Sequence, residues 1–328
     1  MKDCFLLMIL VTKNLQSKFW IVIIASVIFY TSIILYSDIS KVTLELNQIK
    51  FEYYLIIFPL VTTSYVVQSM RFNLILHKIG IKLRFKDSFL IYTAGASMSV
   101  TPAGLGAVIK SYILKKKIGK SFSSTIPVII FEKWIDMVGI VIVIGVLLFW
   151  IDFVESLIVF TIGLIFLSFI FVILKKKVAL NFIKNTTNKI RFMKKFIVNF
   201  EDAQGTVSKL FSTRIILETL PYTLLHKAIS IMTVFLIFES FQIDFDVLLS
   251  GQIYYTSTMI GALTFIPGGI IVVESGLLGL ILKSGIALST ASVLVLMIRF
   301  VTMWYYLIIG FFVLKIMLKK DELKSDKL

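Results

Sequence analysis

Long apolar stretches recur along the whole chain, and they constrain its fold more than any other feature of the sequence. Of 328 residues, 58% are hydrophobic and 16% are charged, whereas about a quarter of the residues of a soluble globular protein are charged. Each stretch has about 18 or more mostly apolar residues, enough for a helix to cross about 30 Å of hydrocarbon. The sequence therefore predicts an all-α polytopic membrane protein.

About six of these stretches are predicted to be full transmembrane helices. They lie at about 19–37, 53–70, 123–149, 156–174, 213–238 and 289–315. Two further apolar segments, 88–109 and 250–282, each contain a proline and two glycines, as at 102–106 and 267–269. A proline inside a helix costs about 3 kcal/mol or more, and glycine adds to that cost. These two segments are therefore expected to be broken, re-entrant helical hairpins.

Basic residues flank the first interrupted segment on both sides. They are Arg71, Lys78, Lys82, Arg84 and Lys86 before it, and Lys110, Lys115, Lys116, Lys117 and Lys120 after it. Because Lys and Arg favour cytoplasmic segments, this segment must turn back inside the membrane. The second segment follows the acidic residues Glu239, Asp244 and Asp246 and is expected to enter from the opposite face. Both termini are then predicted to lie in the cytoplasm, on a protein of the cell (plasma) membrane.

The whole chain, 1–328, is expected to be one integral-membrane domain built from two halves. The halves, about 53–149 and 213–315, are predicted to be inverted repeats, each with one broken hairpin and a following span. Between them, 175–212 is predicted to be a cytoplasmic amphipathic segment on the membrane surface, since apolar clusters alternate with lysines there. The net charge of +15 then reflects the preference of Lys and Arg for the cytoplasmic side of the membrane, and it does not indicate nucleic-acid binding.

Spacing is the basis for the predicted repeat. Lys133 follows Pro102 by 31 residues, near the start of the next span. Arg299 follows Pro267 by 32 residues, at a comparable place in the second half. Broken helices of inverted topology are typical of transporters that bind their substrate near the membrane midplane. Chance similarity between two glycine-containing apolar segments is the competing explanation.

Ionisable residues at span depth are the candidate site. Each costs about 2.5–3.5 kcal/mol when it is unpaired at the membrane centre. Glu132 and Asp136 share a helix face, and Lys133 is three residues from Asp136, which allows either local neutralisation or lipid contact. Arg299 needs a partner from another helix, for which Glu274 is the candidate. It serves either in a structural ion pair or as a bidentate holder of phosphate.

The helix over 213–238 carries a second polar stripe. Glu218, Tyr222 and His226 lie along it with Pro221, which loosens the nearby backbone. Two readings stay open for this stripe, namely a gating role and hydrogen bonding within the bundle. Separately, the half-helices that begin after Pro102 and Pro267 present unpaired N–H groups that suit a lipid phosphate.

Four sequence segments resemble those of the lysylphosphatidylglycerol synthase transmembrane-region family, also called flippase-like domain proteins. They are Thr-Pro-Ala-Gly-Leu-Gly at 101–106, Glu-Lys-Trp-Ile-Asp at 132–136, Pro-Gly-Gly with a later glutamate at 267–274, and a lone arginine, Arg299. Together they cover about 70–312. Ala107 and Ile-Ile-Val at 270–272 depart from the family pattern. The resemblance implies lipid translocation or lipid-headgroup handling, without the synthase reaction of the family's soluble aminoacyl-transferase domain.

The predicted function is a flippase-like transporter that handles an anionic phospholipid or a lipid-linked headgroup. The expected substrate-binding residues are Thr101, Pro102, Gly104, Gly106, Glu132, Lys133, Asp136, Pro267, Gly268, Gly269, Glu274 and Arg299. The alternatives are an integral-membrane transferase that uses Glu132, Asp136 or Glu274 as a base, and an accessory subunit for a lipid-modifying enzyme. With one cysteine, two histidines and no catalytic motif, the sequence predicts no metal and no cofactor, and it does not support an enzyme.

Overall fold

The protein is almost entirely helical. The computed structural model describes residues 24, 28–32, 35, 39–47, 49–97, 105–150, 154–175 and 200–325, and these contain helices, turns and short loops but no strand. The predicted all-α fold is therefore confirmed for this part of the chain. The turn at 101–104 and most of the predicted first span, 19–37, lie outside the described residues.

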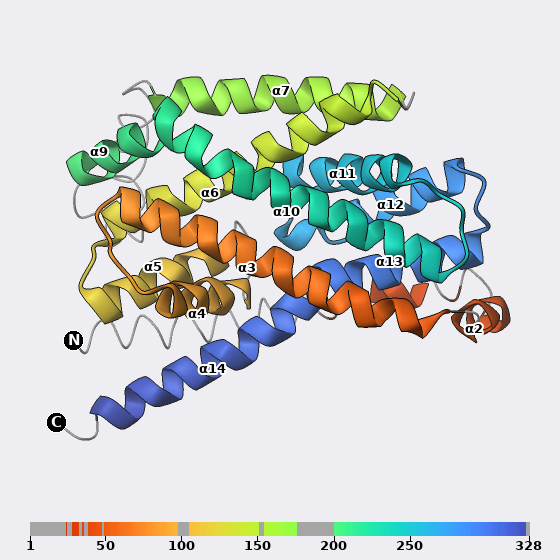
Figure 1. Ribbon diagram of the computed structural model, residues 1–328, viewed down its shortest axis with the longest axis horizontal. Helices are drawn as coiled ribbons and strands as arrows, with labels where there is room; N and C mark the ends of the chain where they lie inside the picture. The colour runs from red at the N-terminus through yellow and green to blue at the C-terminus, as the bar shows by residue number, and fades with distance from the viewer. Residues whose placement is uncertain are drawn as a thin grey trace.

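Long helices run along the length of the molecule (Figure 1). Within the described residues, those long and apolar enough to cross a membrane are Phe51–Lys78, Val154–Leu174, Thr213–Ser240 and Leu288–Met317. They comprise α3 (Tyr54–Lys78), α7 (Val154–Lys175), α10 (Thr213–Ser240), and the run of α13 (Leu288–Arg299), the π-helical η5 (Phe300–Trp304) and α14 (Tyr305–Ser325). These agree with four predicted spans. A fifth helix, α6 (Phe122–Leu147), is 26 residues long but carries three charged residues in its middle.

The two interrupted segments form helical hairpins that enter from opposite ends of the molecule (Figure 1). The first consists of α4 (Phe85–Ala96) and α5 (Leu105–Ile118), and it lies at the end where α3 finishes. The second consists of α11 (Val247–Leu263), the short turn η4 (Pro267–Gly269) and α12 (Val272–Lys283). It lies at the opposite end, near α2 (Ile39–Asn47). This opposed arrangement is the one that the charge pattern predicts.

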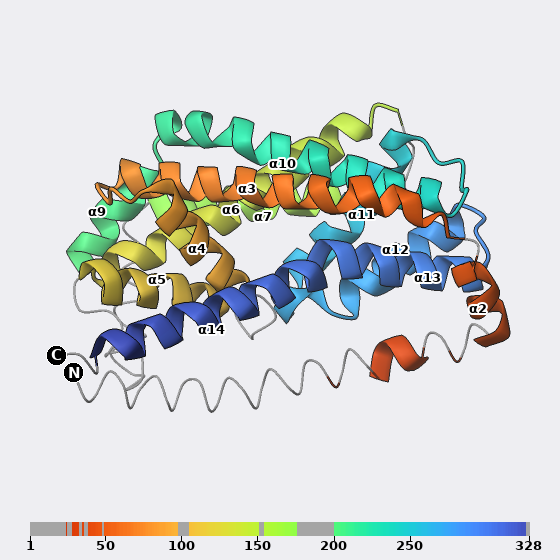
Figure 2. The ribbon, with the colours of Figure 1, turned by 60° about the horizontal axis from the view of Figure 1, so that its bottom comes forward.

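The buried apolar residues form two large clusters, and α11 of the second hairpin contributes to both. Phe72 and Phe131 belong to the cluster around the first hairpin, whereas Ile57, Phe238 and Leu294 belong to the cluster around the second. The long helix α14 lies across α4 (Figure 2). The partly buried Tyr254 and Tyr306 pack against both clusters.

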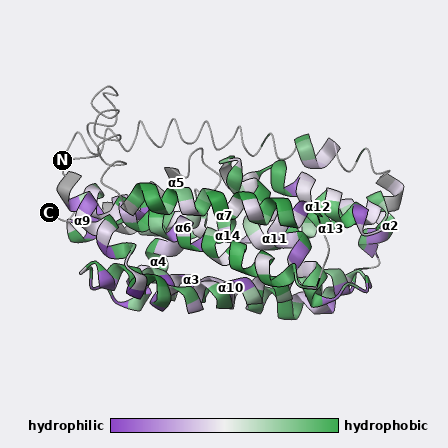
Figure 3. Cartoon of the chain, turned by 90° about the horizontal axis from the view of Figure 1, so that it is seen from above, coloured by the Kyte–Doolittle hydropathy of each residue, from purple (hydrophilic) through white to green (hydrophobic). Residues whose placement is uncertain are grey.

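The outer surface suits a lipid environment. Hydrophobic residues cover much of α7 and neighbouring helices, while hydrophilic ones gather toward both ends of the molecule (Figure 3). On α7, the side chains of Ile158, Ile165 and Phe169 are 53–65% exposed. Water would oppose such exposure of large apolar side chains, but hydrocarbon does not.

The helix α9 (Phe200–Leu210) corrects one prediction. Val207, Leu210 and the following Phe211 are buried, and the ring centroid of Phe211 lies 5.3 Å from that of Phe131 on α6. The apolar face of α9 is therefore covered by protein and not by the membrane surface. Residues 176–199 of the predicted amphipathic segment lie outside the described part of the chain.

Candidate functional site

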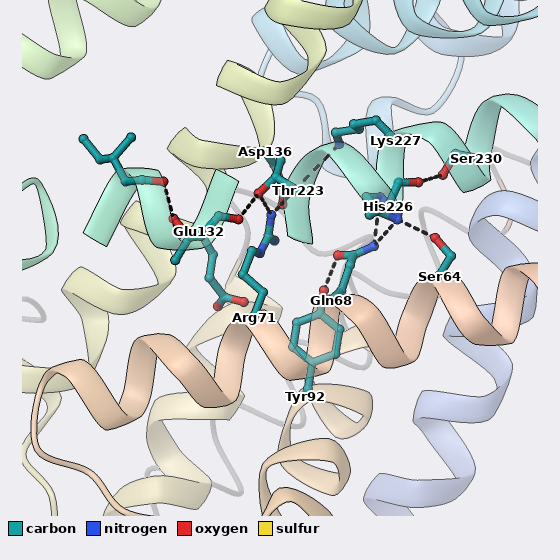
Figure 4. Close-up of polar contacts among 12 residues, drawn as sticks. Ser64, Gln68, Arg71, Tyr92, Glu132, Asp136, Thr223, His226, Lys227 and Ser230 are labelled. Carbon is teal, nitrogen blue, oxygen red and sulfur yellow. Dashed lines mark hydrogen bonds and ion pairs between the residues drawn. The ribbon is translucent and has the colours of Figure 1, made fainter. Parts of the chain in front are cut away.

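A partly buried carboxylate, Asp136 on α6, lies close to two cations from other helices (Figure 4). Arg71 on α3 donates from Nη1 to Asp136 Oδ1 at 2.8 Å and to Thr223 Oγ1 at 2.8 Å. The Lys227 Nζ atom, on α10, lies 3.8 Å from the same Oδ1 atom. The packing of α3, α6 and α10 thus brings these three charges together at one oxygen.

A second buried ion pair joins the first hairpin to α6. The Lys110 Nζ atom, on α5, lies 3.2 and 3.1 Å from the two carboxylate oxygens of Glu132. It also lies 4.0 Å from the centroid of the Tyr92 ring and 4.8 Å from that of Phe72. These two rings hold the ammonium from the other side by cation–π attraction. We call Arg71, Lys110, Glu132, Asp136 and Lys227 the first charged centre.

Neutral hydrogen-bonding groups extend the first charged centre along α3 (Figure 4). Ser64, Gln68 and Arg71 are four and three residues apart, so they share one face of this helix. Ser64 Oγ lies 2.5 Å from Nδ1 of His226, and Gln68 Nε2 lies 2.9 Å from its Nε2. The Tyr92 hydroxyl donates to Gln68 Oε1. The interface between α3 and α10 is thereby polar over several turns.

The first charged centre has one more positive group than negative groups. Three cations face two carboxylates, and the Nε and Nη2 atoms of the fully buried Arg71 have no hydrogen-bond partner among the described residues. The Asp136 side chain remains 24% exposed, compared with 0% for Arg71 and 6% for Lys227. Because an uncompensated buried charge is costly, this centre favours an anion that approaches beside Asp136.

A second charged centre lies at the second hairpin and consists of Tyr30, Glu274 and Arg299. Arg299 Nε donates to Glu274 Oε1 at 2.7 Å, and its Nη2 donates to the Gly268 carbonyl at 2.7 Å. The Tyr30 hydroxyl donates to the same Glu274 oxygen at 2.9 Å. The predicted pairing of Arg299 with Glu274 is confirmed. The π-helical turn η5 begins immediately after Arg299, and such turns recur at functional sites.

The turn of the second hairpin depends on its glycines. Gly268 and Gly269 have φ angles of 64° and 63°, in the left-handed region that glycine adopts most readily. A Cβ atom on Gly269 would also lie 2.5 Å from Val273 Cγ2. Together with Pro267, which begins η4, these residues turn the chain so that the Gly268 carbonyl reaches Arg299.

Lys133 does not occupy its predicted place. It lies on the exposed side of α6, and no ion pair of its side chain is found in the described part of the chain. The predicted neutralisation of Asp136 by Lys133 is wrong, because Arg71 from α3 occupies that position. The neighbouring residue Glu132 points inward, toward Lys110.

The sequence pattern does not identify Arg71 and Lys110 as members of the first charged centre. It places both in the basic flanks of the first hairpin, but their side chains are 0% and 12% exposed. The signal for Arg71 is its helical spacing from Ser64 and Gln68, which are also polar. The signal for Lys110 is the apolar sequence around it. Ile109 precedes it, and Tyr112, Ile113 and Leu114 lie between it and the exposed lysines at 115–117.

The residues of the predicted polar stripe on α10 lie in different surroundings. Glu218 is 31% exposed and pairs with Lys78 and Arg214 near the start of α10, so it lies apart from the buried polar network. Tyr222 is half-buried. His226 is the member of the stripe that joins the buried polar network.

The remaining predicted residues belong to the first turn. Thr101, Pro102 and Gly104 lie outside the described residues, and Gly106 lies in the first turn of α5. Within the described ranges there is no group of three or more His, Cys, Asp or Glu side chains that could hold a metal ion.

Comparison with known proteins identifies one family. The family described as lysylphosphatidylglycerol synthase TM region matches residues 22–310. The matched residues include both hairpins and both charged centres. No curated protein matches the chain.

Proposed function

This chain belongs to the lysylphosphatidylglycerol synthase transmembrane-region family, and on that premise we propose that it binds an anionic membrane lipid and moves it between the two leaflets. Membership of this family indicates a membrane protein with a lipid-related function. The finer proposal concerns the substrate, a lipid whose phosphate-bearing headgroup has a net negative charge, and the activity, which is its transport between leaflets. The proposed setting is the plasma membrane, with both termini in the cytoplasm.

The surplus positive charge of the first charged centre carries this proposal. Arg71 and Lys227 share one carboxylate oxygen of Asp136, so together they are not neutralised by it. A phosphate placed beside Asp136 would remove the surplus charge, and the free N–H groups of Arg71 are suitable donors for it. The acyl chains would stay in the surrounding hydrocarbon.

The second charged centre supports a transport path and not merely a binding site. Its hairpin enters from the end opposite to the first, as in transporters that bind substrate between two inverted halves. Under this proposal the pair of Lys110 with Glu132 and the pair of Glu274 with Arg299 are counterparts in the two halves. Arg299 offers a planar fork to a headgroup when Glu274 releases it.

The test is a leaflet-exchange assay in liposomes that contain the purified protein. Fluorescent phosphatidylglycerol should exchange faster than in empty liposomes, and faster than fluorescent phosphatidylcholine. Arg71→Gln should abolish most of this difference. Lys133→Gln, which removes an exposed lysine of the same region, should exchange as the wild type does.

Two results would contradict the proposal. One is exchange of phosphatidylglycerol at the rate of empty liposomes while the protein remains folded. The other is a change in the mass of the lipid after incubation, measured by mass spectrometry, which would indicate a transferase.

A further inference from the structure

Lys227 is a buried cation without a carboxylate of its own. Its Nζ atom is 3.8 Å from Asp136 Oδ1, beyond hydrogen-bond distance, and that oxygen already accepts from Arg71 Nη1 at 2.8 Å. The residue is 5% exposed. No hydrogen bond of its Nζ is found among the residues that the structure describes. Arg71 is therefore the partner of Asp136, and the protonation state of Lys227 decides whether the centre has a surplus charge.

The surroundings of Lys227 are shaped to hold its side chain. Gly139 on α6 leaves space for it, because a Cβ atom there would lie 3.3 Å from Lys227 Cε and 2.5 Å from Thr223 Cγ2. The Nζ atom also lies 5.6 Å from the ring centroid of Tyr255 on α11. The titratable and charged groups near Lys227 are Asp136 and Lys133 from α6, Arg71 from α3, Tyr255 from α11 and His226 from its own helix.

The surplus charge can be removed in two ways. Because either one is sufficient, the protonation state of Lys227 is linked to anion binding. Lys227 can release its proton, which leaves Arg71 and Lys110 to balance Glu132 and Asp136. Alternatively, Lys227 keeps its proton and an anion balances it. A neutral centre therefore has Lys227 as an amine when it is empty and as an ammonium when a monoanionic phosphate group is bound.

We propose that binding of a phosphate-bearing headgroup at the first charged centre is coupled to uptake of one proton by Lys227. The inference rests on the proposed function and adds a coupling ion to it. The proton adds to the amine nitrogen of Lys227 as the headgroup arrives, and no bond within the lipid changes. Asp136 is the most exposed member of the centre, with 24% of its side chain accessible. A proton gradient would then bias the direction of transport.

The sign of the pH dependence follows from this linkage. Where the empty centre holds Lys227 as an amine and the loaded centre holds it as an ammonium, each bound headgroup takes a proton from solution. The dissociation constant then rises with pH, with a limiting slope of about tenfold per pH unit.

The experiment is titration calorimetry of the full-length protein in detergent with short-chain phosphatidylglycerol, in two buffers of different ionisation enthalpy. The apparent binding enthalpy should differ between the buffers by an amount that corresponds to uptake of up to about one proton. Short-chain phosphatidylcholine should show no such difference, because its choline cation already balances the charge of its phosphate. Lys227→Arg should bind phosphatidylglycerol without proton uptake, because arginine stays charged. The control Lys209→Gln, which removes an exposed lysine of α9, should take up protons as the wild type does.

The outcomes separate this inference from the proposed function. Binding of phosphatidylglycerol with no dependence on the buffer, or undiminished uptake in Lys227→Arg, would overturn the coupling alone. Failure of the folded wild type to bind phosphatidylglycerol would overturn the proposed function instead. If Lys227→Arg does not fold, Lys227→Met provides the test. This variant has a neutral side chain at position 227, so it should bind phosphatidylglycerol more weakly than the wild type. Its binding should take up no proton, and its dissociation constant should not change with pH.

Discussion

Lys110 contacts both carboxylate oxygens of Glu132, at 3.2 and 3.1 Å, and this pair fixes the second helix of the first hairpin to the helix that follows. In the second half of the chain the charges are exchanged. There the hairpin helix carries the acid, Glu274, and the following helix carries the base, Arg299. Glu132, and not Lys133, therefore makes the contact in the first half that Arg299 makes in the second.

The buried pair of Lys110 with Glu132 leads to a prediction about stability. Glu132→Ala should lower the free energy of unfolding by about 3–5 kcal/mol, because it leaves the ammonium of Lys110 buried without a partner. Adding Lys110→Met should restore most of that loss. Thermal unfolding in detergent measures both variants. Lys133→Ala, next to Glu132 but on the exposed side, is the control and should unfold like the wild type.

Substitutions of Arg299 distinguish a structural role of this residue from a role in lipid transport. Arg299→Lys keeps the positive charge but loses the planar fork, so lipid exchange should fall strongly while the protein stays folded. Arg299→Ala should destabilise the protein by about 3–5 kcal/mol, and Arg299→Ala with Glu274→Ala should recover that loss. Leaflet exchange and thermal unfolding are measured on the same samples. Normal exchange by a stable double variant would leave Arg299 as a structural residue only.

The opposed hairpins predict which surface positions share a side of the membrane. Lys82, between α3 and α4, and Asp244, between α10 and α11, are both exposed and lie at opposite ends of the molecule. On a Cys4→Ser background, an impermeant thiol reagent should label Asp244→Cys in intact cells but neither Lys82→Cys nor Lys115→Cys. Lysed cells provide the control, since all three should then react. Labelling of Lys115→Cys in intact cells would contradict the first hairpin.

Close packing of α14 on α4 depends on Gly310. A Cβ atom there would lie 2.6 Å from the Thr93 carbonyl oxygen and 2.6 Å from the Ser97 nitrogen, both of which are backbone atoms. Gly310→Ala should therefore lower the free energy of unfolding by about 1–3 kcal/mol, as overpacking does. Gly279→Ala on α12, where nothing lies within 4 Å, is the matched control and should be neutral or stabilising. Equal unfolding temperatures for the two variants would show that α14 does not pack tightly on α4.

Much of the architecture could be predicted from the sequence because it depends on local properties. Hydropathy locates the long helices, and the Pro-Gly segment at 265–271 locates the turn of the second hairpin. Basic and acidic flanks then place the two hairpins at opposite ends. The pairing of Arg299 with Glu274 was also predictable, since a lone charge in an apolar span needs a partner and few are present.

The composition of the first charged centre was decided only by the tertiary structure. Lys110 belongs to a run of basic residues in the sequence, yet it is buried, while Lys133 lies among charged neighbours and is exposed. Whether a cation is exposed at a helix end or is buried depends on whether another helix brings it a carboxylate. For Arg71 that carboxylate is 65 residues away, on Asp136. Helix packing decides this pairing, because burial of either charge alone would be unfavourable.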